Sequence, residues 1–183
     1  MTDLSTRDLL LKTASDLFRR KGYDGVGLSE ILKASGVPKG SLYHHFPGGK
    51  AELGAAATRW IGGVLQRRLD RAFESSASFT DGMVALCALL GDWVALGACP
   101  VMSVVQAGDQ DPQLREAARA VLDDWRGCLR AHAERLGEPD PEDLAEQLLM
   151  QLEGAWVIAS AEGEPRAFRK LSDFLQKAQK LAI

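Results

Sequence analysis

The sequence contains no asparagine and only three cysteines, Cys87, Cys99 and Cys128. The absence of asparagine excludes an N-glycosylation acceptor. The three cysteines are odd in number and widely spaced, and none belongs to a C-x-x-C pair, so the sequence indicates neither a disulfide framework nor a zinc site and fits a reducing compartment. The polar N-terminus MTDLSTRD lacks the apolar run of a signal peptide. We therefore expect a cytoplasmic protein.

Neither charge sign dominates the chain, but the two signs are unevenly distributed. Its 183 residues are 46% hydrophobic and 26% charged, which is typical of a globular protein and excludes disorder. Residues 1–50 carry eight Lys/Arg against five Asp/Glu, whereas residues 51–183 carry fourteen against twenty. The net charge of -3 therefore hides a basic N-terminal part, where a polyanion would bind.

Strand-like alternation of apolar and polar residues is also lacking. Leu10, Ala14, Leu17 and Phe18 instead follow the spacing of one face of an amphipathic helix. With capping residues, glycines and prolines as boundary signals, the sequence predicts an all-α fold with helices over about 5–21, 28–35, 38–46, 50–73, 80–97, 112–136, 141–162 and 165–181.

The segment 82–108 is long and apolar, with Asp92 as its single charge. Pro100 and two glycines interrupt it, and no Lys/Arg flank lies close to either end. These features argue against a transmembrane helix. We expect a broken, buried helix pair that lines a cavity, and no membrane partner.

Residues 28–46 read LSEILKASGVPKGSLYHHF, which predicts two short helices joined by a tight turn at Gly36. This is the geometry of a helix-turn-helix. The second helix is expected to expose a cation, a small glycine, two hydroxyls and an imidazole. Such groups suit phosphates and base edges in a DNA major groove. The exposed residues are Lys39, Gly40, Ser41, Tyr43 and His44.

Together with Gly22-Tyr23 and Lys50, this run resembles the DNA-binding domain of TetR-family repressors over residues 6–66. The stretch from Tyr43 to Lys50 and the later Gly97-Ala98-Cys99-Pro100-Val101 are similar to the LmrA/YxaF-like branch. The resemblance implies a homodimeric repressor that binds a palindromic double-stranded operator. It also implies a helix-turn-helix at about 29–48 and an effector-binding and dimerisation domain over 67–183.

Carried onto this sequence, the resemblance places Lys39, Ser41, Tyr43 and His44 on the recognition helix. Tyr43 and Lys50 match positions that grip phosphate, Gly40 lets the backbone approach DNA, and Ser29 opens the preceding helix, where phosphate can bind. Two positions depart from the family pattern. Gly27 stands where many members have a Thr or Ser cap, and Ala51 stands where Glu is common. Neither of these two differences contradicts the prediction of DNA binding.

The C-terminal part carries an apolar, aromatic set of residues that we expect to line an effector pocket. Such a lining favours a small hydrophobic or aromatic effector over a sugar or phosphate. The predicted ligand-binding residues are Trp93, Cys99, Met102, Val105, Trp125, Leu129, Met150 and Trp156.

Two apolar stripes on the last two helices are wider than one neighbouring helix needs. Paired across a two-fold axis they would form a four-helix bundle, so they predict a homodimer. The alternative is that they pack only inside one chain. The predicted interface residues are Leu148, Leu149, Leu152, Trp156, Phe168, Leu171 and Leu175.

The remaining signals for chemistry are weak. Gly48-Gly49-Lys50 does not complete a phosphate-binding loop, because His44 and Ala51 stand where that motif needs glycine and Ser/Thr. The histidines show no metal-ligand spacing, and we expect His132 to be solvated, so no metal, cofactor or catalytic residue is predicted. Two other functions stay open: a helical small-molecule-binding protein or enzyme that uses the C-terminal cavity, and an adaptor that has lost DNA binding.

Overall fold

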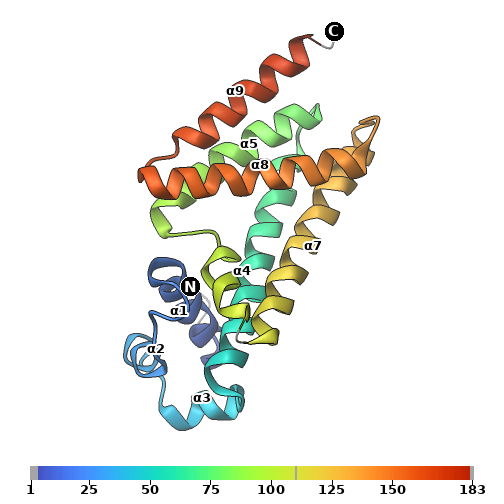
Figure 1. The fold of residues 1–183 in the computed structure, drawn as a ribbon. Coiled ribbons are helices and arrows are strands. Elements are labelled where there is room, and N and C mark those ends of the chain that lie inside the picture. The colour runs from blue at the N-terminus through green and yellow to red at the C-terminus, as the bar shows by residue number, and fades with distance from the viewer. Residues whose placement is uncertain (1–3, 110, 182–183) are drawn as a thin grey trace. The chain divides into compact units, whose positions relative to one another are not determined.

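The computed structural model describes residues 4–109 and 111–181, and this part of the chain is helical without strands. Its order is α1 (Thr6–Lys21), α2 (Leu28–Ser35), α3 (Lys39–His45), α4 (Gly49–Glu74), α5 (Phe79–Trp93), α6 (Met102–Val105), α7 (Pro112–Arg135), α8 (Pro141–Glu162) and α9 (Arg166–Leu181) (Figure 1). The predicted all-α class is confirmed. The helix boundaries fall within a few residues of those expected.

Local capping explains why these boundaries were predictable. The Ser5 hydroxyl accepts the backbone N–H of Asp8 at 3.1 Å and starts α1, while the Gly22 N–H donates to the Phe18 carbonyl and ends it. The second helix ends at Gly36, whose φ of 69° lies in the left-handed region that glycine adopts without strain.

The chain divides into two compact units: residues 1–63 with 99–122, and residues 64–98 with 123–183. The long helices α4 and α7 each contribute residues to both units. Residues 99–122 thus belong with the N-terminal helices. The functional domain boundary expected near residue 66 stays a prediction.

The first unit has a continuous apolar core beneath α1, α2 and α3. One hydrogen bond and one packing contact join residues 99–122 to the N-terminal helices. The Tyr23 N–H donates to the Ser103 carbonyl at 3.0 Å, and Gly62 lies against the Val121 side chain. The core is built from Leu10, Leu11, Ala14, Phe18, Val26, Ile31, Val37, Leu42, Phe46, Leu53 and Ala57.

The apolar segment after α5 is broken, as expected. It continues from α5 into a 3₁₀ turn at Val94–Leu96, then α6 and a second 3₁₀ turn at Gln106–Asp109. No helix in the described part of the chain combines the length and the apolar character needed to cross a membrane.

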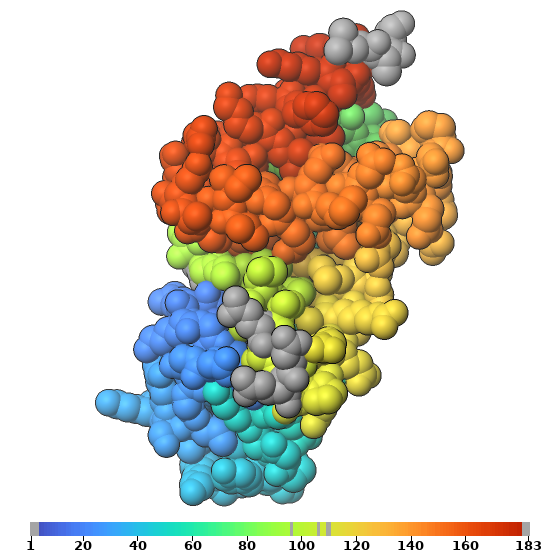
Figure 2. All heavy atoms as spheres, viewed as in Figure 1, coloured from blue at the N-terminus to red at the C-terminus, as the bar shows by residue number. Residues whose placement is uncertain are grey.

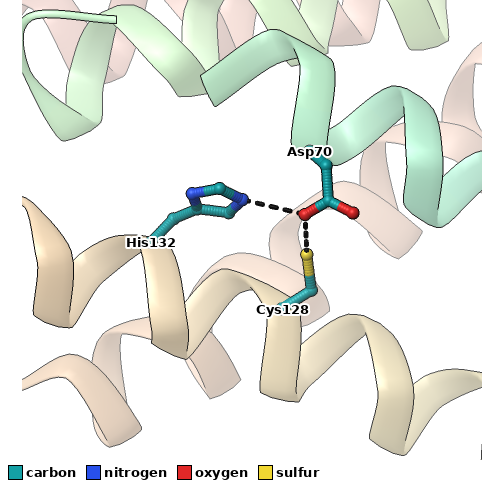
Figure 3. A group of neighbouring side chains, drawn as sticks. All are labelled: Asp70, Cys128 and His132. Carbon is teal, nitrogen blue, oxygen red and sulfur yellow. Dashed lines mark hydrogen bonds and ion pairs between the residues drawn. The ribbon is translucent and has the colours of Figure 1, made fainter. Parts of the chain in front are cut away.

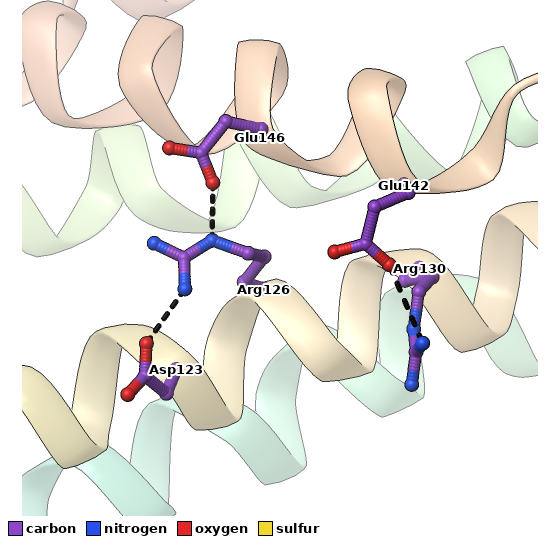
Figure 4. A network of polar contacts seen from close by, with 5 residues as sticks. All are labelled: Asp123, Arg126, Arg130, Glu142 and Glu146. Carbon is purple, nitrogen blue, oxygen red and sulfur yellow. Dashed lines mark hydrogen bonds and ion pairs between the residues drawn. The ribbon is translucent and has the colours of Figure 1, made fainter.

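In the second unit, α5 packs against both α8 and α9, and α8 packs against α9 (Figure 1). Two arginines of α7 reach acidic residues of α8: Arg126 pairs with Glu146, and Arg130 Nη1 lies 3.3 Å from Glu142 Oε2 (Figure 4). These side chains are largely exposed, so the pairs contribute little to stability. Apolar burial carries the packing instead.

The close approach of α5 to Phe73 gives a stability prediction. A Cβ at Gly82 would lie 2.2 Å from Phe73 Cδ1, whereas one at Gly127, also within a helix, meets no atom within 4 Å. Phe73 is fully buried and cannot move aside. We expect Gly82→Ala to lower the free energy of unfolding by about 1–3 kcal/mol. The matched Gly127→Ala should raise it by roughly 0.5–1 kcal/mol through helix propensity. Urea denaturation measures both, and equal effects would contradict the packing argument.

Candidate nucleic-acid interface

The turn between α2 and α3 has the compact form of a helix-turn-helix. The Gly36 N–H donates to the Leu32 carbonyl at 2.9 Å, and the Val37 N–H donates to Ser35 Oγ at 3.3 Å. Pro38 then precedes the first turn of α3 in an extended conformation. These two hydrogen bonds and the conformation of Pro38 fix the direction in which α3 leaves the turn.

The two faces of α3 differ sharply. Leu42 and, just after the helix, Phe46 are buried in the core of the first unit. The opposite face is open: the Tyr43 side chain is 43% exposed, and Lys39, Gly40 and His44 are exposed as well, with Ser41 half-buried. The structure therefore brings the predicted recognition residues together on one accessible surface.

Gly40 has no structural reason to be glycine. A Cβ at this position would meet no protein atom within 4 Å, and its backbone φ is not positive. Packing within the described chain therefore does not require glycine here, and the close-approach role of Gly40 stays a prediction.

Aromatic rings lie near both lysines of this surface. Lys50 Nζ lies 4.1 Å from the centroid of the Tyr23 ring, and Lys39 Nζ lies 5.9 Å from that of Tyr43. Burial raises the pKa of Tyr23 to about 12, with Asp111 and Asp24 adding to the effect, so its ring is a neutral phenol. The contact holds the Lys50 ammonium at the start of α4.

The N-terminal ends of α2 and α4 complete the surface. Gly27 caps α2 without a side-chain hydrogen bond, and Ser29 in its first turn is exposed. At the start of α4, the Gly48 N–H donates to Glu52 Oε2 at 2.7 Å. The sequence departs from the family pattern at Ala51, but Glu52 supplies a carboxylate to this end of the helix.

A narrow apolar cavity lies in the second unit, with a space of about 30 Å³. Three of the predicted ligand-binding residues line it: Trp125, Leu129 and Trp156. The other lining residues are Leu65, Leu69, Leu86, Leu90, Leu149, Leu152 and Glu153. Glu153 is the single ionisable group among them.

The structure does not bring the other predicted ligand-binding residues to this cavity. Trp93 is buried with its ring under the guanidinium of Arg68, 4.6 Å away, and Met150 is 60% exposed. Cys99, Met102 and Val105 belong to the first unit; Cys99 is buried there, and the other two are more than two-fifths exposed.

The predicted dimer residues fall mostly inside the chain. Leu171 and Leu175 are half-buried, and the other five are buried, namely Leu148, Leu149, Leu152, Trp156 and Phe168. The exposed large apolar side chains of α8 and α9 are different ones: Met150, Val157, Ile158 and Phe174. The sequence could have indicated this second apolar side, since Met150, Val157 and Ile158 recur with helical spacing on the side of α8 opposite the buried leucines.

Two features were missed from the sequence. His132 is not solvated as expected: its side chain is 15% exposed and its ring stacks on Phe73 with centroids 4.6 Å apart. Arg19, buried in the first unit, has Cys99 close enough to raise its pKa, although burial lowers that pKa more strongly. Both arrangements join residues far apart in sequence, so no local spacing predicted them.

Comparison with known proteins matches both halves of the chain. The model of bacterial regulatory proteins of the tetR family matches residues 10–57, and that of the C-terminal domain of LmrA/YxaF-like transcriptional regulators matches residues 91–174. The HTH-type transcriptional regulator LmrA of Bacillus subtilis (strain 168) is 31% identical over 137 residues, covering 72% of this chain and 73% of its own. YxaF of the same strain is 43% identical over 72 residues, 39% of this chain and 38% of its own.

Solved structures agree on the fold. The crystal structure of the reduced form of Escherichia coli NemR superposes with a TM-score of 0.82 at 23% identity, covering 95% of this chain and 96% of that one. A helix-turn-helix with an open recognition face, the two family matches and the LmrA relationship together show that this chain belongs to the TetR family of DNA-binding transcriptional regulators, in its LmrA/YxaF-like branch.

Proposed function

We propose that the protein is a cytoplasmic, homodimeric repressor that leaves a palindromic operator when a small hydrophobic effector binds. The observation that carries the proposal is the open surface of α3, where Lys39, Tyr43 and His44 are exposed while Leu42 is buried. A short helix that is anchored by an apolar side and exposes a polar side suits the DNA major groove.

Each residue of this face has a distinct role in the proposal. Lys39, Ser41 and His44 reach base edges, while Gly40 admits close approach of the sugar-phosphate backbone. Tyr43 and Lys50 bind phosphates on either side of the groove. The free N–H groups at the start of α2, with the Ser29 hydroxyl, bind a further phosphate.

The cavity of the second unit is the proposed effector site. Its indole and leucine lining suits a flat apolar molecule, but a space of about 30 Å³ holds little more than water. Drug-sized ligands occupy pockets of roughly 300–1,000 Å³, so an effector must bind a rearranged, wider conformation of this unit.

The helix α4 supplies the link to DNA binding. Leu65 and Leu69 of α4 line the cavity, and Lys50 of the same helix belongs to the DNA-binding surface. Widening the cavity displaces α4 and changes the population of the DNA-binding conformation. A tenfold loss of operator affinity needs only about 1.4 kcal/mol of differential binding.

The exposed apolar side of α8 and α9 is the proposed dimer interface. Met150, Val157 and Ile158 lie on one side of α8, and Phe174 of α9 is 59% exposed. The two helices lie side by side and form a continuous surface in Figure 2, orange and red. Burying this patch against a second copy removes it from water and joins two chains that carry one recognition helix each.

The repressor function is tested by binding to DNA from the regions that flank its gene, with random-sequence selection as a second source of operators. We expect a specific gel shift that a planar hydrophobic compound releases. Leu129→Phe, which fills the cavity, should raise the effector concentration for half-release at least tenfold. The control Ala131→Phe, two residues along on the exposed side of α7, should leave it unchanged. Release that survives Leu129→Phe would place the effector elsewhere.

The phosphate contacts are tested by Lys50→Ala and Tyr43→Ala. Each should weaken binding to specific and non-specific DNA alike by about tenfold, because a charged or polar phosphate contact is lost. Lys50→Ala should also reduce the slope of log affinity against log salt by about one unit. Fluorescence anisotropy at several salt concentrations measures both quantities. Lys177→Ala on α9 is the control. Unchanged DNA affinity in both Lys50→Ala and Tyr43→Ala would contradict the proposed phosphate contacts.

The dimer interface is tested by Val157→Arg. A charge buried in an apolar interface is costly, and the two-fold axis introduces it twice, so we expect the dissociation constant of the dimer to rise at least a hundredfold, on the order of 3 kcal/mol. Analytical ultracentrifugation measures the change. Ala131→Arg on the exposed side of α7 serves as the control. A monomer in the unmodified protein, or a dimer that tolerates Val157→Arg, would exclude this face.

A further inference from the structure

Three side chains of the kinds that bind metal ions meet in the second unit, and none of them lines the cavity. Asp70 comes from α4, and Cys128 and His132 come from successive turns of α7 (Figure 3). Their carboxylate, thiol and imidazole ligand atoms all lie within 4.8 Å of one another. The proposed DNA-binding and effector functions use none of the three.

In the metal-free chain, Asp70 Oδ1 joins the other two groups by hydrogen bonds. The Cys128 thiol donates at 2.9 Å, and His132 Nε2 lies 3.0 Å away. Burial raises the pKa of Asp70, but these hydrogen bonds outweigh it and hold that pKa below its ordinary value. The thiol and the imidazole of α7 both point at this one carboxylate oxygen of α4 (Figure 3).

We propose that Asp70, Cys128 and His132 form a binding site for a divalent transition-metal ion, with Zn²⁺ as the preferred ion. Thiolate, imidazole and carboxylate are the three ligand types that zinc takes from proteins. Thiolate and imidazole together disfavour Mg²⁺ and Ca²⁺, which take oxygen ligands. None of the three residues belongs to the cavity lining or to the proposed DNA-binding surface.

Two of the three ligand separations are close to those of a zinc site, and the third, between the Cys128 sulfur and the His132 nitrogen, is within 4.8 Å, where tetrahedral zinc sets about 3.5 Å. Tetrahedral zinc with its usual bond lengths sets S–O and N–O ligand separations of about 3.5 Å and 3.3 Å. The observed 2.9 Å and 3.0 Å hydrogen bonds therefore open by a few tenths of an ångström as the ion replaces the shared protons. Cys128 and His132 are four residues apart on one helix, a spacing that keeps both on the same face.

Solvent reaches the site and can complete the coordination. The Asp70 and His132 side chains are 46% and 15% exposed, which leaves a fourth position for water. On the other side, the His132 ring stacks on Phe73, which fixes the plane of the imidazole. A metal ion with three protein ligands and one water can exchange with solvent, unlike a structural ion that is held by four protein ligands.

Metal binding displaces two protons from the cluster. The Cys128 thiol loses its proton to solvent, although burial and Asp70 raise the pKa of that thiol. The proton on Nε2 of His132, which faces the Asp70 carboxylate, also leaves to solvent, and the neutral imidazole that binds through Nε2 carries its proton on Nδ1. Arg135 Nη2 lies 3.4 Å from that Nδ1 and moves away from it, while its 3.0 Å hydrogen bond to the Phe73 carbonyl persists.

The test uses the full chain without an affinity tag, freed of metal, and titrated with Co²⁺ as a spectroscopic probe for zinc. We expect a thiolate-to-cobalt charge-transfer band that saturates at one ion per chain and disappears when Zn²⁺ is added. We also expect excess Zn²⁺ to raise the melting temperature by about 5–10 °C when free Zn²⁺ is a hundredfold above its dissociation constant.

Matched variants assign the band to this site. Cys128→Ser keeps a hydroxyl donor for Asp70 and should fold, which circular dichroism checks, yet it should abolish the band and the melting shift. Asp70→Asn should weaken Co²⁺ binding at least tenfold. Cys87→Ser changes a buried cysteine of α5 outside the cluster and should retain both signals. Absence of the band in the unmodified protein, or its survival in Cys128→Ser, overturns the proposal and leaves a hydrogen-bonded triad alone.

Discussion

DNA recognition in this protein depends on the burial of one side of a seven-residue helix. A helix as short as α3 is not stable alone in water, because nucleation costs more than so few hydrogen bonds return. Leu42 and Phe46 supply the missing stability by entering the core of the first unit. Burying each side chain contributes roughly 1.5–3 kcal/mol. The polar groups on the other side of α3 are presented to DNA only because this anchoring holds.

The helix α4 contributes residues to both units. Its first turn carries Lys50, held over the Tyr23 ring, and its later turns carry Leu65 and Leu69 into the cavity of the second unit. One continuous helix therefore carries residues of the proposed DNA-binding surface and of the proposed effector cavity. A ligand that binds among its later residues acts on the conformational equilibrium of the whole element, and only a differential affinity for the two conformations is required.

The sequence predicted what local chemistry decides. Ser5, Gly36 and Pro141 mark helix ends through capping and backbone preferences, and the structure places the ends there. The α3 surface was predictable for the same reason, since Leu42 and Tyr43 must point in different directions on a helix. For α8, periodicity predicted one broad apolar stripe, but it did not say whether that stripe packs inside the chain or against a second copy. The buried side holds Leu148 and Leu152, and the exposed side holds Val157 and Ile158.

What the sequence could not predict are pairings between distant segments. His132 reads as a surface residue beside Arg130 and Glu134, because nothing in its neighbourhood indicates Asp70, 62 residues earlier. Cys99 likewise has no cation near it in sequence, yet the fold brings Arg19 close to it. In both cases a charged or polar group is buried by long-range packing. Such positions are where sequence periodicity is least informative.

The two proposed ligand sites of the second unit share a segment of α4. Leu69 lines the cavity, and the next residue, Asp70, accepts the hydrogen bonds of Cys128 and His132. Leu129 of α7 also lines the cavity and follows Cys128 directly. An ion that joins Asp70 to α7 restrains the two helices that an effector must separate to enter. Coupling between binding free energies is reciprocal, so an effector that widens the cavity must weaken metal binding by the same factor by which the metal weakens effector binding.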